Sequence, residues 1–181
     1  KNFLKSKKNK FGNYFILTIH REENTKNKKN LTKILRELVK LSLKQKCKVI
    51  FPTHPKTKKI LEKIKYKKNI IKSIDPMDYF NFLSLLKNAK LAVSDSGGIQ
   101  EEACILRVPL ITIRNSTERP ETLKIGCNIL SKIEDNMIYK HSSTILRRNI
   151  KWKNPYGSGK ASVNSYKIIK NFIKKNHAKF Y

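Results

Sequence analysis

The sequence predicts an α/β domain built on a doubly wound parallel sheet of the Rossmann-like type. Short apolar runs of strand length alternate along the chain with segments whose apolar residues recur at helical spacing. The connections between them are short, which favours parallel strands joined by helices that cover both faces of the sheet. With 181 residues, the chain is long enough to bury a core without disulfides or metals.

The first part of the chain opens with the run YFILTI at 14–19, which predicts a buried strand. The polar stretch 20–30 predicts a loop. Apolar residues at helical spacing predict a helix over 31–43. The run KVIF at 48–51 predicts the next strand, which Pro52 ends.

The middle of the chain repeats this alternation. A lysine-rich amphipathic pattern predicts a helix over 56–66, and the brief apolar segment 69–71 predicts a strand. Asp78 is a suitable N-cap for a helix over 78–88. The run Leu-Ala-Val-Ser at 91–94 predicts a strand.

The last part follows the same pattern after a glycine pair. We expect helices at 98–106, 134–148 and 161–175, strands at 109–113 and 127–130, a charged loop at 114–121 and a turn at 154–160. The expected organisation is a linker at 1–13, a Rossmann-like lobe at 14–160 and a C-terminal helical segment at 161–181 that packs back across the lobes of a larger protein.

The net charge of +28 raises the alternative of a basic nucleic-acid-binding module. Only seven of the 41 basic residues are arginine, however, and the lysines are scattered over the whole chain. Proteins that recognise phosphates and base edges usually do so through arginine. We therefore interpret the charge as solvated surface and expect no nucleic-acid partner; a nucleic-acid module would show steep salt dependence of binding.

The three cysteines form no C-x-x-C pair, so neither a disulfide framework nor a zinc site is indicated. Cys47 and Cys104 are expected to be small buried hydrophobes in a reducing cytosol. No apolar stretch approaches the roughly 18 residues of a membrane span, and no signal peptide opens the chain. Because its first residue is lysine, the chain is expected to be a piece of a longer cytoplasmic protein.

The segment SDSGGIQEEA at 94–103 places a glycine pair between a strand and a helix. Gly97 and Gly98 let a ligand approach the backbone, and the amides of a helix N-terminus favour an anion. Ser96 adds a hydroxyl, so a diphosphate fits this turn. Glu102, one turn further, suits the two hydroxyls of a ribose. The alternative is a plain tight turn whose glutamates complement the helix dipole.

This segment, followed by TERPET, is similar to the non-hydrolysing UDP-N-acetylglucosamine 2-epimerases. The resemblance continues through TIHREEN at 18–24, PTHP at 52–55, IDPMDYFNFL at 74–83 and NPYGSGKA at 154–161, in the family's order. It implies a glycosyltransferase-B-type fold, in which two Rossmann-like lobes hold UDP between them. This chain resembles the second, C-terminal lobe, so the N-terminal lobe is missing from it.

The resemblance also implies roles for individual residues. His20 resembles the family's essential histidine, supported by its neighbours in HREEN, although a histidine at a strand end is often structural. Phe82 resembles a uracil platform, with plain core as the alternative. Arg119 suits phosphate or sugar, with a surface loop charge as the alternative. The full set of expected site residues is His20 as catalytic, and His54, Phe82, Ser96, Gly97, Gly98, Glu102 and Arg119 as substrate-binding.

The implied activity is the interconversion of UDP-GlcNAc and UDP-ManNAc by elimination and re-addition of UDP across C1–C2. The resemblance implies no nicotinamide or metal cofactor, a homodimer, and a place in cell-envelope polysaccharide synthesis. Carboxylates that move the C2 proton belong to the missing lobe. A hydrolysing epimerase and a UDP-sugar glycosyltransferase remain alternatives; the paired HREEN and TERPE strings argue against the transferase.

Overall fold

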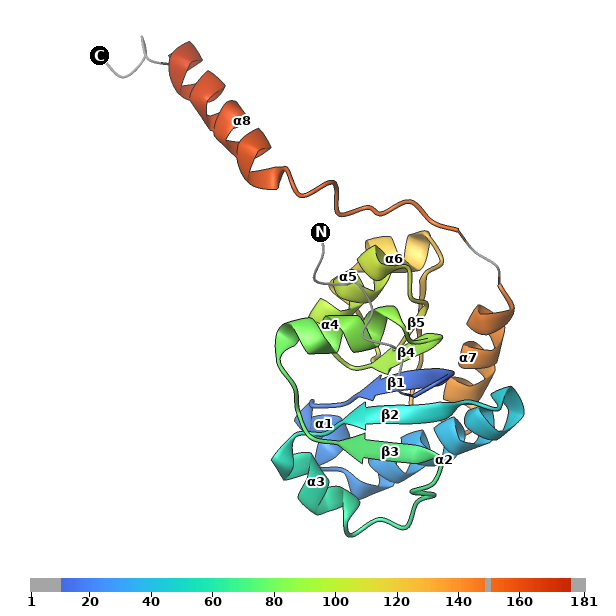
Figure 1. The fold of residues 1–181 in the computed structure, drawn as a ribbon. Helices are drawn as coiled ribbons and strands as arrows, with labels where there is room; N and C mark the ends of the chain where they lie inside the picture. Colours follow the sequence, from blue (N-terminus) through green and yellow to red (C-terminus); the bar gives the residue numbers. More distant parts are fainter. Residues whose placement is uncertain (1–10, 149–150, 177–181) are drawn as a thin grey trace.

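A six-stranded parallel sheet forms the centre of the protein (Figure 1). The computed structural model describes residues 11–148 and 151–176. The strand order is β3-β2-β1-β4-β5-β6, so the chain winds outward in one direction from β1 and then in the other from β4. The strands are β1 Tyr14–Thr18, β2 Lys48–Pro52, β3 Ile71–Ile74, β4 Leu91–Ser94, β5 Leu110–Thr112 and β6 Asn128–Leu130. This topology confirms the predicted fold class.

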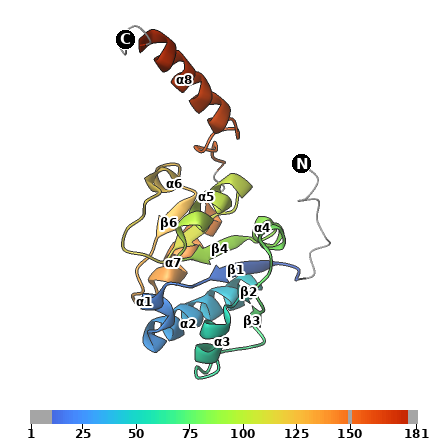
Figure 2. The same ribbon diagram turned by 90° about the vertical axis from the view of Figure 1, so that its left-hand side faces the viewer.

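Helices cover both faces of the sheet (Figure 2). One face is covered by α2, α3 and α7, and the other by α4 and α5. The helices are α1 Glu22–Thr25, α2 Lys28–Gln45, α3 Pro55–Leu61, α4 Tyr79–Lys87, α5 Gly97–Leu106, α6 Pro120–Lys124, α7 Met137–Arg147 and α8 Ala161–Asn176.

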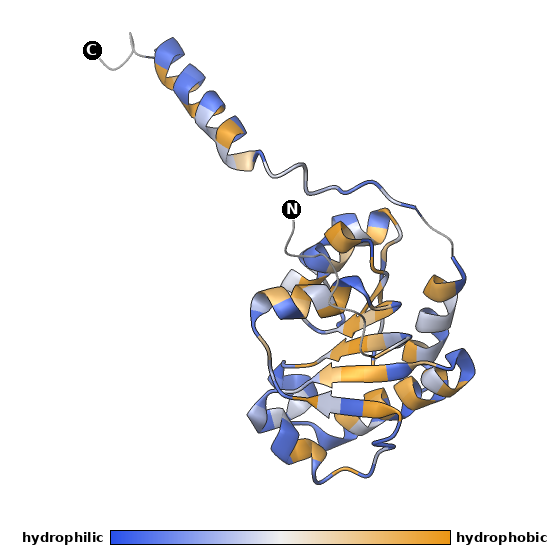
Figure 3. Ribbon diagram, in the orientation of Figure 1, coloured by the Kyte–Doolittle hydropathy of each residue, from blue (hydrophilic) through white to orange (hydrophobic). Residues whose placement is uncertain are grey.

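The central strands are buried on both faces because their apolar residues alternate between two cores. In β1, Phe15 and Leu17 join the core under α2 and α7, whereas Tyr14 and Ile16 join the core under α4 and α5. Figure 3 shows the resulting concentration of apolar residues in the strands. The Tyr14 hydroxyl donates to the carbonyl of Leu85 at 2.6 Å, and burial raises the pKa of Tyr14 to about 12. Continuous apolar runs such as YFILT are typical of strands covered on both sides.

The structure differs from the sequence-based expectation in three connections. The predicted loop at 20–30 contains α1 and the first turn of α2, where the Asn27 side chain accepts from the amide of Asn30. The third strand lies at 71–74 instead of 69–71, because residues 67–71 form a turn in which Lys67 accepts from two following amides. The charged loop at 114–121 ends in α6, which begins at Pro120.

The three cysteines are free and buried. Burial of Cys47 and Cys104 was expected from the sequence. Burial raises the pKa of all three thiols. Over the ranges 11–148 and 151–176, no helix has the length and apolar character needed to cross a bilayer.

Helix α8 stands apart from the sheet (Figures 1 and 2), and none of its residues is buried. Its predicted bounds are confirmed within one residue. One stripe of the helix is apolar and exposed, with Val163, Tyr166, Ile169 and Phe172 each more than half exposed. The domain division expected from the sequence, with α8 packing across a second lobe, stays a prediction.

Candidate functional site

The candidate site lies at the carboxyl ends of β1 and β4, the two strands where the winding direction of the sheet reverses. Ligands of open parallel sheets bind at this switch point, because the loops that leave the two strands diverge there. The segment after β1 carries His20, and the segment after β4 carries Ser96. The strands pair directly, with Thr18 opposite Ser94.

The turn at 96–98 leaves open space above the start of α5. Ser96 is the N-cap of this ten-residue helix, and its side chain makes no capping hydrogen bond within the described chain. Gly97 and Gly98 begin the helix, and neither has the positive φ that favours glycine. A Cβ on Gly98 would have no described atom within 4 Å, and a Cβ on Gly97 would make only an ordinary contact with Glu118 at 3.8 Å. Neither backbone strain nor internal crowding therefore explains the glycine pair, whereas a ligand close to the backbone would.

Four of the residues expected from the sequence line one pocket of about 260 Å³ beside this turn. They are His20, His54, Phe82 and Ser96. Phe82 is partly buried against the core under α4 and α5, and its remaining surface faces the pocket. The pocket is lined by Thr18, His20, Pro52, His54, Pro76, Met77, Phe82, Ser96 and Ile99.

His54 also has a structural task. It is the N-cap of α3, and its Nδ1 accepts a hydrogen bond from the amide of Lys56 at 3.2 Å. An accepting Nδ1 carries no proton, so the neutral ring bears its proton on Nε2. The exposed ring of His54 remains part of the pocket wall.

Asp95 joins the two loops of the site, although it was not among the site residues expected from the sequence. Its side chain is fully buried. It accepts from the amides of His20 and Arg21 at 3.2 and 3.0 Å, from Nδ2 of Asn24 at 3.0 Å, and it contacts Nδ1 of His20 at 3.1 Å. The available signal was its position between a buried strand and the glycine pair, where a buried carboxylate needs several donors.

Glu102 lies on α5 one turn after the glycine pair and is partly buried. Burial raises the pKa of its carboxyl, a hydrogen bond to the Tyr79 side chain opposes this rise, and the charge of Glu101 adds to it. Glu102 does not line the pocket of about 260 Å³. It lies further along α5, one turn beyond the glycine pair.

Arg119 is held in the TERP segment by a partly buried polar network. The Thr117 hydroxyl donates to Oε1 of Gln100 at 2.5 Å and accepts from the amide of Arg119 at 3.0 Å. The Arg119 guanidinium forms an ion pair with Glu101 on α5. Arg119 therefore lies beside α5, and its charge is already paired with a carboxylate.

Arg114 and Glu118 form a bidentate ion pair, and neither residue was among the site residues expected from the sequence. Both hydrogen bonds are 2.6 Å long, and the Arg114 side chain is only 8% exposed. The Arg114 guanidinium lowers the pKa of Glu118 to about 2. Arg114 lies two residues after the end of β5, and this position was the signal for its place at this edge of the sheet.

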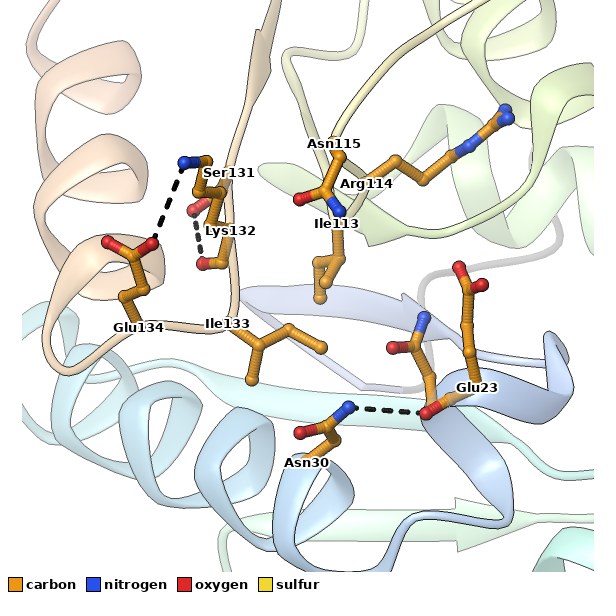
Figure 4. A pocket seen from close by; sticks show the side chains of 10 residues that line it. Glu23, Asn30, Ile113, Arg114, Asn115, Ser131, Lys132, Ile133 and Glu134 are labelled. Atoms are coloured by element: carbon orange, nitrogen blue, oxygen red, sulfur yellow. Dashed lines mark hydrogen bonds and ion pairs between the residues drawn. The ribbon is translucent and has the colours of Figure 1, made fainter.

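A larger, polar pocket of about 620 Å³ lies at the same edge, towards β5 and β6 (Figure 4). None of the site residues expected from the sequence lines it. Asn24 borders both this pocket and Asp95. Figure 4 shows the ion pair of Lys132 with Glu134 and the hydrogen bond from Asn30 to the carbonyl of Glu23. The lining residues are Glu23, Asn24, Asn30, Ile113, Arg114, Asn115, Ser131, Lys132, Ile133 and Glu134.

Comparison with known proteins finds one family. The family model of UDP-N-acetylglucosamine 2-epimerase matches residues 1–170. A UDP-N-acetylglucosamine 2-epimerase of Methanococcus maripaludis is 45% identical over 173 residues, which cover 93% of this chain and 46% of that protein. The enzyme of the same name from Methanocaldococcus jannaschii is 43% identical, and the match covers 44% of that protein. The chain thus spans about half the length of these relatives.

Solved structures of the same family also resemble this chain. The UDP-GlcNAc 2-epimerase of M. jannaschii in complex with UDP-GlcNAc and UDP is 41% identical, with a TM-score of 0.78 over 88% of this chain and 45% of that chain. A heptosyltransferase of Escherichia coli, 15% identical with a TM-score of 0.57, shares the fold alone. The motifs, the sheet order and these matches agree, and the chain belongs to the UDP-N-acetylglucosamine 2-epimerase family.

Proposed function

We propose that this chain is the UDP-binding lobe of a non-hydrolysing UDP-GlcNAc 2-epimerase. The observation that carries the proposal is the turn at 96–98, where two glycines begin a helix at the switch point of the sheet. Neither a positive φ nor a steric clash within the described chain requires glycine at these two positions. An anion at a helix N-terminus gains hydrogen bonds from free amides and a favourable dipole. The relative from M. jannaschii, similar to this chain over 88% of its length, was solved with UDP-GlcNAc and UDP.

In the proposed reaction, the C2 proton of the sugar leaves to a base while the C1–O bond breaks, and its electron pair departs with UDP. The diphosphate then carries the developing charge. Amides of Gly97 and Gly98 stabilise this charge because they are already oriented before the bond breaks. Glu102 holds the ribose, Phe82 offers an aromatic face to the base, and His20 lies nearest the reacting sugar. UDP adds back to C1 after C2 has been reprotonated on the opposite face.

Titration calorimetry of UDP into the 181-residue chain tests the nucleotide site. We expect binding with a dissociation constant in the micromolar to millimolar range. The Glu102→Ala variant should bind about 10- to 100-fold more weakly, because a charged hydrogen bond contributes about 1.5–3 kcal/mol. Glu62→Ala, which makes the same charge change at the C-terminus of α3, should leave the affinity unchanged. A folded chain that binds no UDP would contradict the proposal.

UDP affinity should also fall on acidification more than the ligand alone explains. Burial raises the pKa of Glu102, and only the ionised carboxylate accepts hydrogen bonds from both ribose hydroxyls. Lowering the pH therefore protonates Glu102 before an exposed glutamate and weakens binding. Because a terminal phosphate titrates near pH ~6, the measurement needs a reference. Glu102→Gln supplies it: the difference in pH dependence between the two proteins belongs to residue 102, and equal profiles would exclude this role.

We propose further that α8 packs against the N-terminal lobe that the relatives possess and this chain does not include. Its apolar stripe is exposed over more than half of each side chain, and no described residue of this lobe covers it. Deleting 161–181 should therefore change the free energy of unfolding of the lobe by less than about 0.5 kcal/mol, as for a surface change. Chemical denaturation of both chains measures this difference. A loss of several kcal/mol would show that α8 stabilises its own lobe instead.

A further inference from the structure

The Asp95 carboxylate lies at the junction of the two loops that form the candidate site. It is 0% exposed, accepts hydrogen bonds from three donors that follow β1, and contacts the His20 ring. The Arg21 side chain closes the junction from the other side, since its Nε donates to the backbone carbonyl of Asp95 at 3.1 Å. The loop of His20 and the turn of the glycine pair are therefore bound together through one residue.

The contact between Asp95 and the His20 ring determines where the histidine proton lies. Nδ1 of His20 lies 3.1 Å from Oδ1 of Asp95, and because an ionised carboxylate only accepts hydrogen bonds, this contact favours a proton on Nδ1. In the neutral ring the other nitrogen, Nε2, then carries a lone pair. Among the described residues no hydrogen bond to Nε2 is formed, and the His20 side chain is 60% exposed at the wall of the pocket. His54 has the opposite arrangement, because its Nδ1 accepts a hydrogen bond.

We infer that Asp95 is a positioning residue that holds His20 in the Nδ1–H tautomer and presents Nε2 to the ligand as a proton acceptor. In this state neutral His20 cannot donate a hydrogen bond from Nε2 to the diphosphate. Its role next to the substrate is to accept a proton or hydrogen bond there. The tautomer rests on the 3.1 Å contact between Nδ1 and the buried carboxylate, whereas its catalytic use rests on the proposed epimerase function.

The arrangement exceeds what anchoring the loop requires. The amides of His20 and Arg21 and the side chain of Asn24 already satisfy both carboxylate oxygens. The ring contact adds nothing to the backbone path of the loop, but it orients the imidazole. A carboxylate that fixes tautomer and orientation of a histidine has a known catalytic effect, since replacing such an aspartate by asparagine in serine proteases lowers kcat about 10⁴-fold through the wrong tautomer.

The test is two-bond ¹H–¹⁵N NMR spectroscopy of the histidine-labelled chain, with His20→Gln and His54→Gln spectra to assign the rings. The wild-type chain is expected to show His20 as the Nδ1–H tautomer and His54 as the Nε2–H tautomer. In Asp95→Asn the amide can donate to Nδ1, and His20 should move to the Nε2–H tautomer. Asn24→Ala removes a different donor from Asp95 and should leave the His20 tautomer unchanged.

An Nε2–H tautomer of His20 in the wild-type chain overturns the inference, and this reading does not depend on whether Asp95→Asn folds. UDP calorimetry on the same samples separates the two proposals: absent UDP binding with an Nδ1–H ring refutes the nucleotide site alone. In the two-lobed enzyme, Asp95→Asn should lower kcat by about 10³- to 10⁴-fold with KM changed less than about threefold. A rise in KM at constant kcat would instead indicate a role in binding only.

Discussion

Replacing Gly98 with alanine is expected to remove UDP binding while leaving the fold intact. The added methyl group would point into space that no described atom of the protein occupies within 4 Å, and the backbone at this position has ordinary helical geometry. Alanine should therefore keep or raise the melting temperature. It lowers the conformational entropy of the unfolded chain, which stabilises the folded state by about 0.4–1 kcal/mol. A phosphate held by the amides of this turn would collide with the methyl group, and we expect affinity to drop by at least about 100-fold, or ~2.7 kcal/mol.

Calorimetry and thermal unfolding of the same Gly98→Ala sample measure the two effects together. Ile105→Ala is the matched control, because Ile105 lies on the same helix, is 49% exposed and is remote from the turn. It should bind UDP as the wild-type chain does. An alanine variant at position 98 with wild-type affinity would show that the diphosphate lies elsewhere, and the larger pocket towards β5 and β6 would then be the next place to examine.

Replacing Phe51 with alanine is expected to destabilise the lobe by about 3–5 kcal/mol, the usual cost of removing a buried phenylalanine ring. Phe51 is fully buried near the end of β2, within the core under α2 and α7. The loss combines the transfer free energy of the ring with that of the cavity left behind. Because small domains have a total stability of about 5–15 kcal/mol, this loss removes a large share of the stability of the lobe and should lower its denaturation midpoint clearly.

Urea denaturation of Phe51→Ala and Phe80→Ala measures this difference against a matched aromatic. Phe80 lies on α4 and is 54% exposed, so its removal should cost well under ~1 kcal/mol. Equal losses in the two variants would mean that the two cores do not dominate stability. A midpoint shift without a change in slope would confirm that the native fold persists.

The central strands were the most predictable part of the fold, because each is a short, mostly apolar run that is buried between the two cores. The runs at 14–19 and 91–94 lie within one residue of β1 and β4. Short helices were the least predictable: α1 has four residues, too few for any periodicity, and begins inside a polar stretch. The third strand was displaced because a turn at 67–71 uses amides of residues that the apolar pattern had assigned to the strand.

The sequence by itself determined the family, the alternation of strands with the longer helices, and the residue types at the turn of the glycine pair. These depend on local pattern, on motifs, and on residues adjacent along the chain. The tertiary structure decided which of these residues share a pocket and what state each is in. Asp95 became a partner of His20, and Arg119 became paired with Glu101, only because parallel packing brings β1, β4 and the segment after β5 to one edge of the sheet. Burial and hydrogen-bond direction arise from contacts between distant residues, and no spacing along the chain encodes them.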